Sequence, residues 1–234
     1  MSRFTDIFSN RHTILPVIHV QSEEQAFRNV SIAQEAKADG VFLIGHTMPF
    51  LKLLKIHDSL REQFPSFWMG MNCLDLPPKD TFEAVGEKVD GIWTDNAMVD
   101  ENATEQPRAD EVLKVQSKIG WKGLYFGGTA FKYQRRVEEL EAAAKLASRY
   151  MDVVTTSGPG TGHAAGLDKI KRMKSALGDI PLAIASGITP ENVKTYMPYA
   201  DCFLVATGIS KSFEELDPLL VEKLVEIVRS YDRW

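Results

Sequence analysis

Short apolar runs recur along the chain, and each is followed by a segment in which apolar residues return every three or four positions. The runs predict buried β-strands, and the segments between them predict amphipathic helices. Eight runs occur, beginning at Ile14, Val41, Phe67, Gly91, Gly123, Asp152, Pro181 and Cys202. Their starts lie roughly 20 to 30 residues apart, which is enough for one strand and one crossover helix.

The runs are continuously apolar and do not alternate with polar residues, which is typical of parallel strands covered on both faces. Eight strand–helix units predict a closed (β/α)8 TIM barrel, whose usual length is about 250 residues. No change of composition divides the 234 residues. We therefore predict a single domain over residues 1–234, with residues 1–13 as a leading segment before the first strand.

Acidic residues mark the start of every second predicted strand, namely Asp39, Asp90, Asp152 and Asp201. The chemistry of such barrels is found at the opposite end, where the strands finish. We interpret the four carboxylates as partners for backbone groups in tight turns and not as catalytic candidates.

Three segments carry helix signals. Ser22 and Gln25 have the spacing of a capping box, and Thr189 followed by Pro190 predicts a helix beginning with proline at its first position. The stretch 130–150 predicts a long helix at its end, with charged residues on a solvated face.

Composition narrows the class of protein. The chain is 44% apolar, with a formal charge of −5 and a pI of about 5.6, and its basic residues are spread among acids. This gives no basic surface for nucleic acid. We see neither a signal-peptide core nor an apolar run of about 18 residues, so we expect a soluble cytoplasmic protein without a membrane span. Cys73 and Cys202 are distant in sequence and predict buried free thiols.

The last third of the chain suggests a phosphate site. The seventh and eighth predicted strands each end in a turn of small residues and glycine, where a barrel can present backbone N–H groups to an anion. The candidate ligands are Ser186, Gly187, Thr207, Gly208 and Ser210, with residues 210–212 beginning a short extra helix. Gly158, Thr161 and Gly162 predict a flap or a second anion contact. The alternative is that these glycines only turn the chain.

The candidate catalytic residues follow earlier strands. Asp95 is the strongest acid or base, because partial burial near a tryptophan would raise its pKa, although an aspartate here is also common as a loop cap. His19 and His46 follow adjacent strands and are candidates for proton transfer, or for ordinary hydrogen bonds. Asn72 could orient substrate hydroxyls, or merely close a turn.

Lys132 follows the fifth predicted strand, in a loop. Its position favours contact with a phosphate or carboxylate over a Schiff base. Together His19, His46 and Asp95 could hold a divalent metal, but no local ligand motif is present, and we predict no cofactor.

Several motifs carry a family resemblance: residues 70–74, Lys132, the Thr161–Gly162 step, residues 186–192, and residues 200–201 leading to Lys211. In these the chain resembles the BtpA/SgcQ family of TIM-barrel proteins. The resemblance implies a phosphate-binding type of barrel, linked in one branch to photosystem I biogenesis and in another to a sugar or nucleoside pathway.

The chain departs from the family pattern at three places. Residues 20–22 stand where the family usually has a proline- and glycine-rich stretch, and residues 45–50 replace a segment that usually carries a Glu–Asn pair and a following Asp. Tyr133 follows Lys132 where a histidine is usual. From the phosphate site and the candidate acid and base we expect an enzyme that acts on a small phosphorylated sugar or on a phosphoribosyl or nucleoside compound. Its acid/base chemistry would be that of an isomerase, a lyase or an enzyme that cleaves glycosidic bonds. The alternative is a noncatalytic assembly or regulatory factor. A homo-oligomer is compatible with either.

Overall fold

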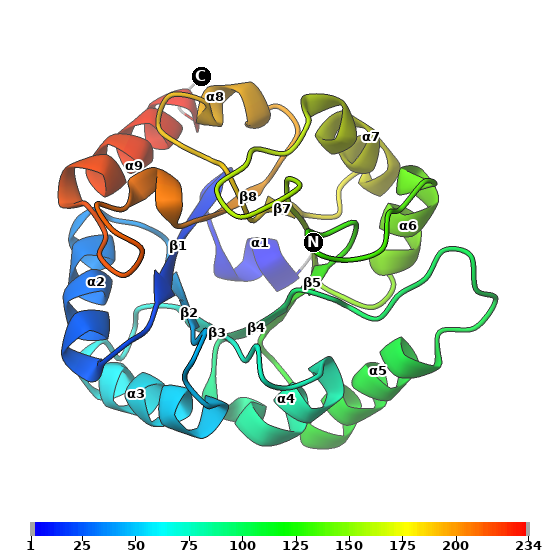
Figure 1. Cartoon of the computed structure of the whole chain (residues 1–234), viewed down its shortest axis with the longest axis horizontal. Helices are drawn as coiled ribbons and strands as arrows, with labels where there is room; N and C mark the ends of the chain where they lie inside the picture. Colours follow the sequence, from blue (N-terminus) through cyan, green and yellow to red (C-terminus); the bar gives the residue numbers. More distant parts are fainter. Residues whose placement is uncertain (1–2, 233–234) are drawn as a thin grey trace.

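The computed structural model, which describes residues 3–232, is a closed barrel of eight parallel strands inside a ring of helices (Figure 1). The strands pair in chain order, and β8 closes onto β1. They are β1 (Thr13–His19), β2 (Val41–Ile44), β3 (Met69–Asn72), β4 (Gly91–Thr94), β5 (Leu124–Gly128), β6 (Val153–Thr156), β7 (Leu182–Ile184) and β8 (Cys202–Val205). The predicted (β/α)8 barrel is confirmed, and each strand lies at its predicted run.

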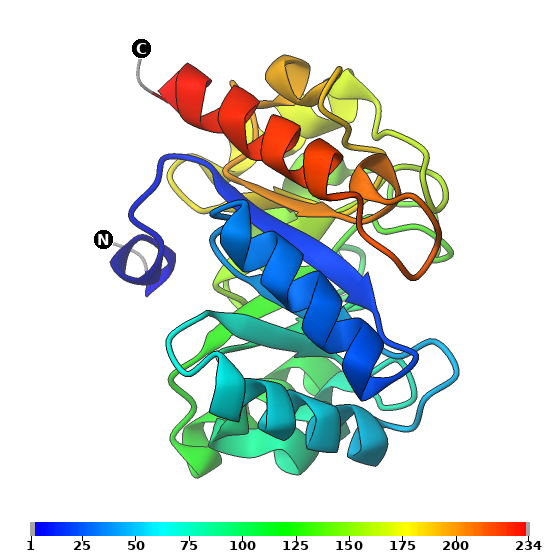
Figure 2. The ribbon, with the colours of Figure 1, turned by 90° about the vertical axis from the view of Figure 1, so that its left-hand side faces the viewer.

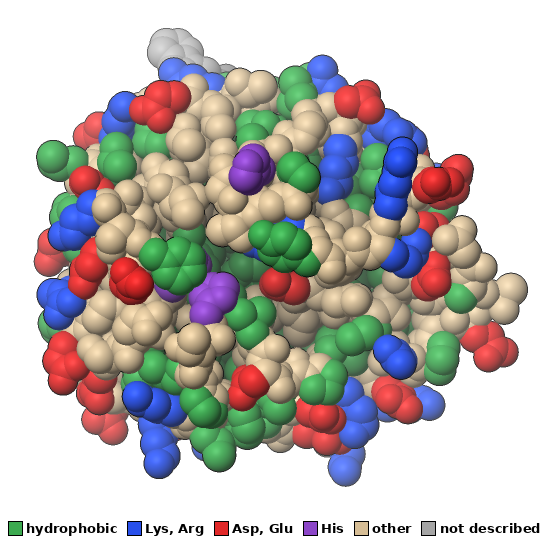
Figure 3. All heavy atoms as spheres, in the orientation of Figure 1, with side chains coloured by type: hydrophobic (Ala, Val, Ile, Leu, Met, Phe, Trp, Pro, Cys, Tyr) green, Lys and Arg blue, Asp and Glu red, His purple; other side chains and the backbone are tan. Residues whose placement is uncertain are grey.

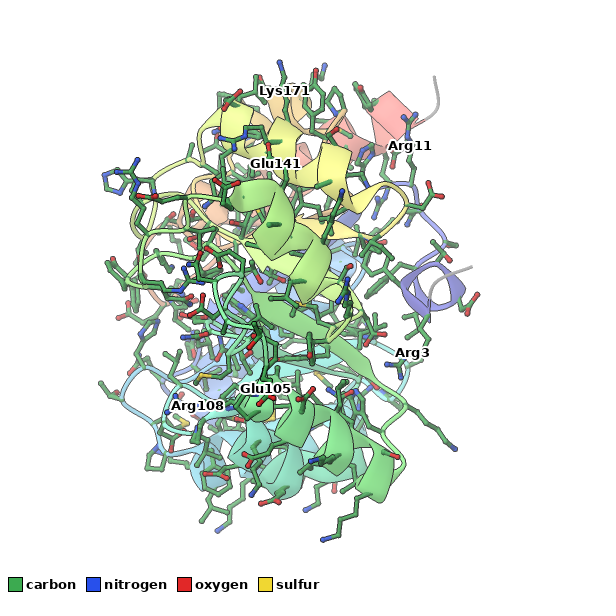
Figure 4. The ribbon with its side chains drawn as sticks, turned by 90° about the vertical axis from the view of Figure 1, so that its right-hand side faces the viewer. Arg3, Arg11, Glu105, Arg108, Glu141 and Lys171 are labelled. Carbon is green, nitrogen blue, oxygen red and sulfur yellow. The ribbon has the colours of Figure 1, made fainter. Side chains whose placement is uncertain are left out.

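Helices α2 to α9 cover the outside of the barrel, and α1 lies at the end where the strands begin (Figure 2). The helices are α1 (Arg3–Ile7), α2 (Glu23–Glu35), α3 (Phe50–Gln63), α4 (Pro78–Val85), α5 (Pro107–Ile119), α6 (Leu140–Ala147), α7 (Leu167–Leu177), α8 (Val193–Tyr196) and α9 (Pro218–Asp232), with 3-10 turns η1 (Gly86–Lys88) and η2 (Thr207–Ile209). The outer helices are joined by pairs such as Glu141 of α6 (Figure 4) with Arg172 of α7.

The leading segment closes one end of the barrel. Figure 2 shows α1 at the end where the strands begin, opposite the loops that follow the strands. Phe4 and Phe8 of this segment are buried and join the aromatic cluster inside the barrel, where Phe8 meets the ring of Trp68 at 5.3 Å and Phe4 meets that of Phe126 at 6.4 Å. The segment thus covers the N-terminal opening with apolar surface, leaving the other end for a site.

The four aspartates before alternate strands bond the backbone, as the sequence predicts. Each accepts a hydrogen bond of 2.7 to 2.9 Å from the N–H of a residue in the preceding strand, and its own N–H donates to the carbonyl of that same residue. The pairs are Asp39 with Ile14, Asp90 with Met69, Asp152 with Tyr125, and Asp201 with Leu182.

Each of these carboxylates also meets a basic side chain. Arg229 contacts Asp39, Arg61 contacts Asp90, Arg3 contacts Asp152 and Lys174 contacts Asp201. Arg3, at the start of α1, lies at the N-terminal end of the barrel (Figure 4). At each of four points around this end of the barrel, one carboxylate thereby links a helix to the preceding strand and to the turn before the next strand.

Two of the helix predictions are wrong. Thr189 caps only a turn, since its hydroxyl accepts from the N–H of Glu191, and α8 begins at Val193 after Asn192. The segment 130–150 is mostly irregular, and its helix α6 covers eight residues, Leu140–Ala147. The capping interaction at Ser22 is confirmed, because its hydroxyl accepts from the N–H of Gln25 at the start of α2.

Both cysteines are buried free thiols, as predicted, and burial raises the pKa of each. Within residues 3–232, no helix combines the length and apolar character needed to cross a bilayer.

We predict that Asp39→Ala lowers the free energy of unfolding by about 2 to 4 kcal/mol, because it leaves the N–H of Ile14 without its acceptor and removes the ion pair with Arg229. The guanidinium then keeps the His12 carbonyl and the more distant Asp232. Urea denaturation measures the loss. Asp179→Ala, which removes an exposed carboxylate with no recorded partner among the described residues, should change stability by less than about 0.5 kcal/mol. Equal midpoints for the two variants would contradict the role given to Asp39.

Candidate functional site

A cavity of about 450 Å³ opens where the loops after the strands meet. Figure 3 looks onto this face and shows histidine and hydrophobic side chains around its central hollow. Of the predicted site residues, the cavity wall contains His19, His46, Asp95, Lys132, Thr161, Gly162, Ser186, Gly187 and Thr207. Residues far apart in the sequence therefore meet at one mouth, as the barrel topology requires.

His19 and His46 lie at the ends of neighbouring strands and touch. Their ring centroids are 4.9 Å apart, with the rings nearly perpendicular. Burial, followed by the charge of His46, lowers the pKa of His19 to about 4, and partial burial also lowers the pKa of the more exposed His46. Both imidazoles are thus neutral near pH 7. The Nδ1 atom of His19 is buried and has no hydrogen-bond partner within residues 3–232.

Asp95 follows β4 and points into the same cavity. The buried amide of Asn72, the last residue of β3, donates to its Oδ1 at 3.0 Å, and the side chain of Gln134 donates to its carbonyl. Burial raises the pKa of Asp95, although the hydrogen bond from Asn72 and the charge of Lys132 oppose the shift. A carboxylate that is held in place and has a raised pKa is suited to accept a proton.

The side chain of Lys132 crosses from the β5 loop to the β6 loop. Its Nζ lies 3.3 Å from the hydroxyl of Thr161, and its backbone N–H donates to the hydroxyl of Ser157 at 2.7 Å. Within the described residues it forms no ion pair. Its ammonium is therefore placed to meet an anionic group of a ligand.

Backbone amides are available at the corner formed by the loops after β7 and β8. In the described part of the chain, no hydrogen bond is recorded for the N–H groups of Ser186, Gly187, Thr207 and Gly208. Gly187 has a left-handed backbone, with φ +65°. Three of these residues, Ser186, Gly187 and Thr207, line the cavity, and unpaired amides in such a place are the feature expected of an anion site.

Close contacts with neighbouring backbone give a reason for the glycines at this corner that the sequence does not predict. A Cβ atom at Gly187 would lie 2.2 Å from the backbone nitrogen of Ala164, and one at Gly208 would lie 1.9 Å from the carbonyl oxygen of Ile188. Gly158 is equally constrained, 2.1 Å from the carbonyl oxygen of His163. Contacts at Gly187 and Gly208 join different loops, and the contact at Gly158 lies within the β6 loop, so the three loops interlock through backbone that only glycine allows.

Some predicted phosphate ligands are engaged elsewhere. The hydroxyl of Ser186 donates to His163 and accepts from the N–H of Gly158, so it has no proton left for an anion in this conformation. Ser210 lies outside the cavity wall, and its hydroxyl donates to the carbonyl of Ala206. No helix begins there: Ser210 forms a bridge with Leu216, and the only short helical turn at this place is η2, which precedes it. Gly158 and Gly208 also lie outside the wall.

Three residues near the site are not among the predicted site residues, although Tyr133 marks a departure from the family pattern. Tyr133 and Phe213 line the cavity from the loops after β5 and β8. Lys169 of α7 donates to the carbonyls of Ala130 and Ser157, which ties the β5 and β6 loops together, and burial lowers its pKa to about 8. The first two are single aromatic residues in polar loops, and a lysine in a helical pattern is unremarkable, so no local signal distinguishes them.

Within residues 3–232, no group of three or more His, Cys, Asp or Glu side chains is placed to share a metal ion. His19, His46 and Asp95 line one cavity but do not form such a group.

The chain belongs to the BtpA family, whose profile matches residues 84–231. An uncharacterized protein of Pyrococcus furiosus is 26% identical over 230 residues, which cover 88% of this chain and 84% of the relative. An uncharacterized protein of Methanocaldococcus jannaschii is 24% identical over 138 residues, 58% of this chain and 50% of the relative.

Solved structures share the fold at low identity. (S)-3-O-geranylgeranylglyceryl phosphate synthase from Thermoplasma acidophilum, in complex with its substrate sn-glycerol-1-phosphate, has a TM-score of 0.69 and 16% identity, covering 98% of this chain and 99% of its own. Phosphoribosyl anthranilate isomerase from Thermus thermophilus has a TM-score of 0.65 and 12% identity, covering 94% and 99%. These similarities establish the TIM barrel.

We predict that protonation of His19 destabilises the protein in acid. The unfolded chain binds this proton near pH 6.5 and the folded chain only near pH 4, so stability falls as the pH drops through that interval. In His19→Gln the loss of unfolding free energy between pH 7 and pH 4.5 should be smaller than in the wild type by roughly 2 to 3 kcal/mol.

Urea denaturation at the two pH values measures this difference. His163→Gln, which replaces an exposed histidine on the same face, should keep the wild-type pH dependence. If the unfolding free energies of His19→Gln and His163→Gln depend on pH in the same way, the inference that His19 is neutral in the folded protein is wrong.

Proposed function

We propose that this protein is an enzyme that binds a small phosphorylated compound of sugar, phosphoribosyl or nucleoside type at the mouth of its barrel. One observation carries the proposal. A single cavity contains the carboxylate of Asp95, whose pKa is raised, the neutral imidazoles of His19 and His46, and unpaired backbone amides of the β7 and β8 loops. Titratable groups perturbed in this way are typical of catalytic sites.

The proposed roles follow the positions of the groups. The amides of the β7 and β8 loops and the ammonium of Lys132 bind the phosphate and any second anionic group. Asp95 accepts a proton from a carbon or hydroxyl of the substrate, or from an attacking water in a glycosidic cleavage, and returns it later in the reaction, while the N–H of a neutral imidazole polarises a substrate oxygen. Isomerisation, carbon–carbon cleavage and glycosidic cleavage can each be built from these steps. The solved barrels whose names include phosphorylated compounds, among them the synthase with sn-glycerol-1-phosphate, agree with the ligand class.

Ligand binding is tested through thermal stability. With ribose 5-phosphate or sn-glycerol 1-phosphate at about 100 times its dissociation constant, the wild type should gain about 2.7 kcal/mol, or roughly 5 to 10 °C in Tm. Thr207→Glu places a carboxylate at the exposed edge of the amide corner and should abolish the gain, because it repels the phosphate.

The matched control is Thr195→Glu, which makes the same change of charge at an exposed position of α8 outside the cavity wall and should keep the gain. Stabilisation that persists in Thr207→Glu would place the phosphate elsewhere. No stabilisation by any phosphorylated compound would favour a noncatalytic assembly or regulatory factor.

Catalysis needs its own test. Asp95→Asn keeps the shape of the side chain and removes the base, so turnover of the substrate found in a screen of phosphorylated metabolites should fall by about 100-fold or more. Phosphate-dependent stabilisation should remain, and Asp179→Asn should retain full activity. A fully active Asp95→Asn protein would exclude Asp95 as the base.

A further inference from the structure

Two exposed aromatic side chains stand at the edge of the cavity. Tyr133, after β5, is 80% exposed, and Phe213, in the loop after β8, is 45% exposed. Both belong to the cavity wall, where hydrophobic side chains are visible around the central hollow (Figure 3). Because β5 and β8 lie on different sides of the barrel, the two rings approach the opening from separate directions.

The backbone of Tyr133 is held in an unfavourable conformation. Its φ is +61°, in the left-handed region that a bulky residue rarely occupies. Its hydroxyl accepts a bond of 3.4 Å from the N–H of Thr161, so the ring is fastened across to the β6 loop. An exposed ring in a strained and fastened position contributes nothing to the core, which points to a role in binding.

Phe213 is also fixed before any ligand arrives. The Ser212 hydroxyl accepts from the N–H groups of Glu214 and Glu215, which forms a tight turn around the ring. The carbonyl of Glu214 accepts from the side chains of Gln25 and Asn29 on α2. The loop is therefore held by its own turn and by bonds from α2 to the residue after Phe213.

The ring of Phe213 covers the histidine pair. Its centroid lies 4.0 Å from that of His19 and 5.3 Å from that of His46. Much of the remaining wall is apolar as well: Val17, Ile44, Leu74, Trp93, Ile188 and Leu204. A volume of about 450 Å³ accommodates more than a phosphate and a short polyol, since small-molecule sites span roughly 300 to 1,000 Å³.

From these observations we infer that the ligand carries, besides its phosphate, a planar unsaturated ring, which stacks against Tyr133 and Phe213. The inference rests on the proposed function and narrows its ligand to phosphorylated compounds with an aromatic or heteroaromatic group. Fixed aromatic faces favour a flat partner, because stacking needs a planar surface on both sides, whereas a saturated ring offers only hydrophobic area.

The test compares phenyl phosphate with cyclohexyl phosphate, which has the same charge and similar size but no planar face. Calorimetry or ligand-observed NMR should give a dissociation constant about five-fold or more lower for phenyl phosphate, as expected from the strength of stacking. Tyr133→Ala and Phe213→Ala should each reduce this preference, while their affinity for inorganic phosphate should be unchanged. Phe27→Ala removes an exposed phenylalanine of α2 outside the cavity wall and should keep it.

The outcomes separate this inference from the proposed function. If the two esters bind equally well, or if the preference for phenyl phosphate persists in both alanine variants, the inference that the ligand carries a planar ring is wrong. If ribose 5-phosphate still stabilises the wild type and not Thr207→Glu, the proposed function stands without it. If no phosphorylated compound binds, the proposed function fails and this inference fails with it.

Discussion

The bond between a turn aspartate and a backbone amide fixes the register on which the site depends. At four of the eight strand junctions, a carboxylate and its own N–H bind both polar groups of one residue in the preceding strand. Side chains in a strand alternate between the two faces, so a slip of one residue would turn the cavity residues outward. With the observed pairing, His19 lies beside Ile44, and Ile44 lies beside Asn72. By fixing the register, the turn aspartates at the beginning of the strands thus help to determine which side chains meet at the other end.

The charged groups at the two ends of the barrel differ in whether they form ion pairs. At the N-terminal end each of the four aspartates has both an amide and a basic partner, which is the arrangement that stabilises a partly buried carboxylate. At the C-terminal end, Asp95 accepts from the amide of Asn72, and the ammonium of Lys132 meets the hydroxyl of Thr161 and the ring of Phe131. Neither side chain forms an ion pair within residues 3–232. Burial without a counter-ion raises the pKa of Asp95. The paired charges that stabilise the fold and the candidate site therefore lie at opposite ends of the barrel, with α1 closing the first.

The sequence predicts the fold almost completely because strand burial follows from local composition. The eight apolar runs define the strands, and the turn aspartates identify the structural end. It also locates the mouth residues His19, His46, Asp95 and Lys132, since topology alone brings strand ends together. The sequence does not predict the hydrogen bonds and side-chain positions that depend on contacts between loops. The hydroxyls of Ser186 and Ser210 bond neighbouring backbone, and Tyr133 and Phe213 acquire their positions from distant anchors, Thr161 and Asn29. Such contacts leave no periodic pattern.

The interlocked glycines give the amide corner its rigidity. Gly187 packs against Ala164 and Gly208 packs against Ile188, so the β6, β7 and β8 loops hold one another without a ligand. Unpaired amides cost free energy in a folded protein, and loops free to move would turn them toward carbonyl groups or water. Because the glycine contacts prevent that rearrangement, the free-energy cost falls on folding, and the anion that we propose for this corner would gain hydrogen bonds without ordering the loops. A side chain at either glycine would separate the loops and release the amides, so the proposed anion binding depends on the fixed corner and not on the number of hydroxyl groups around it.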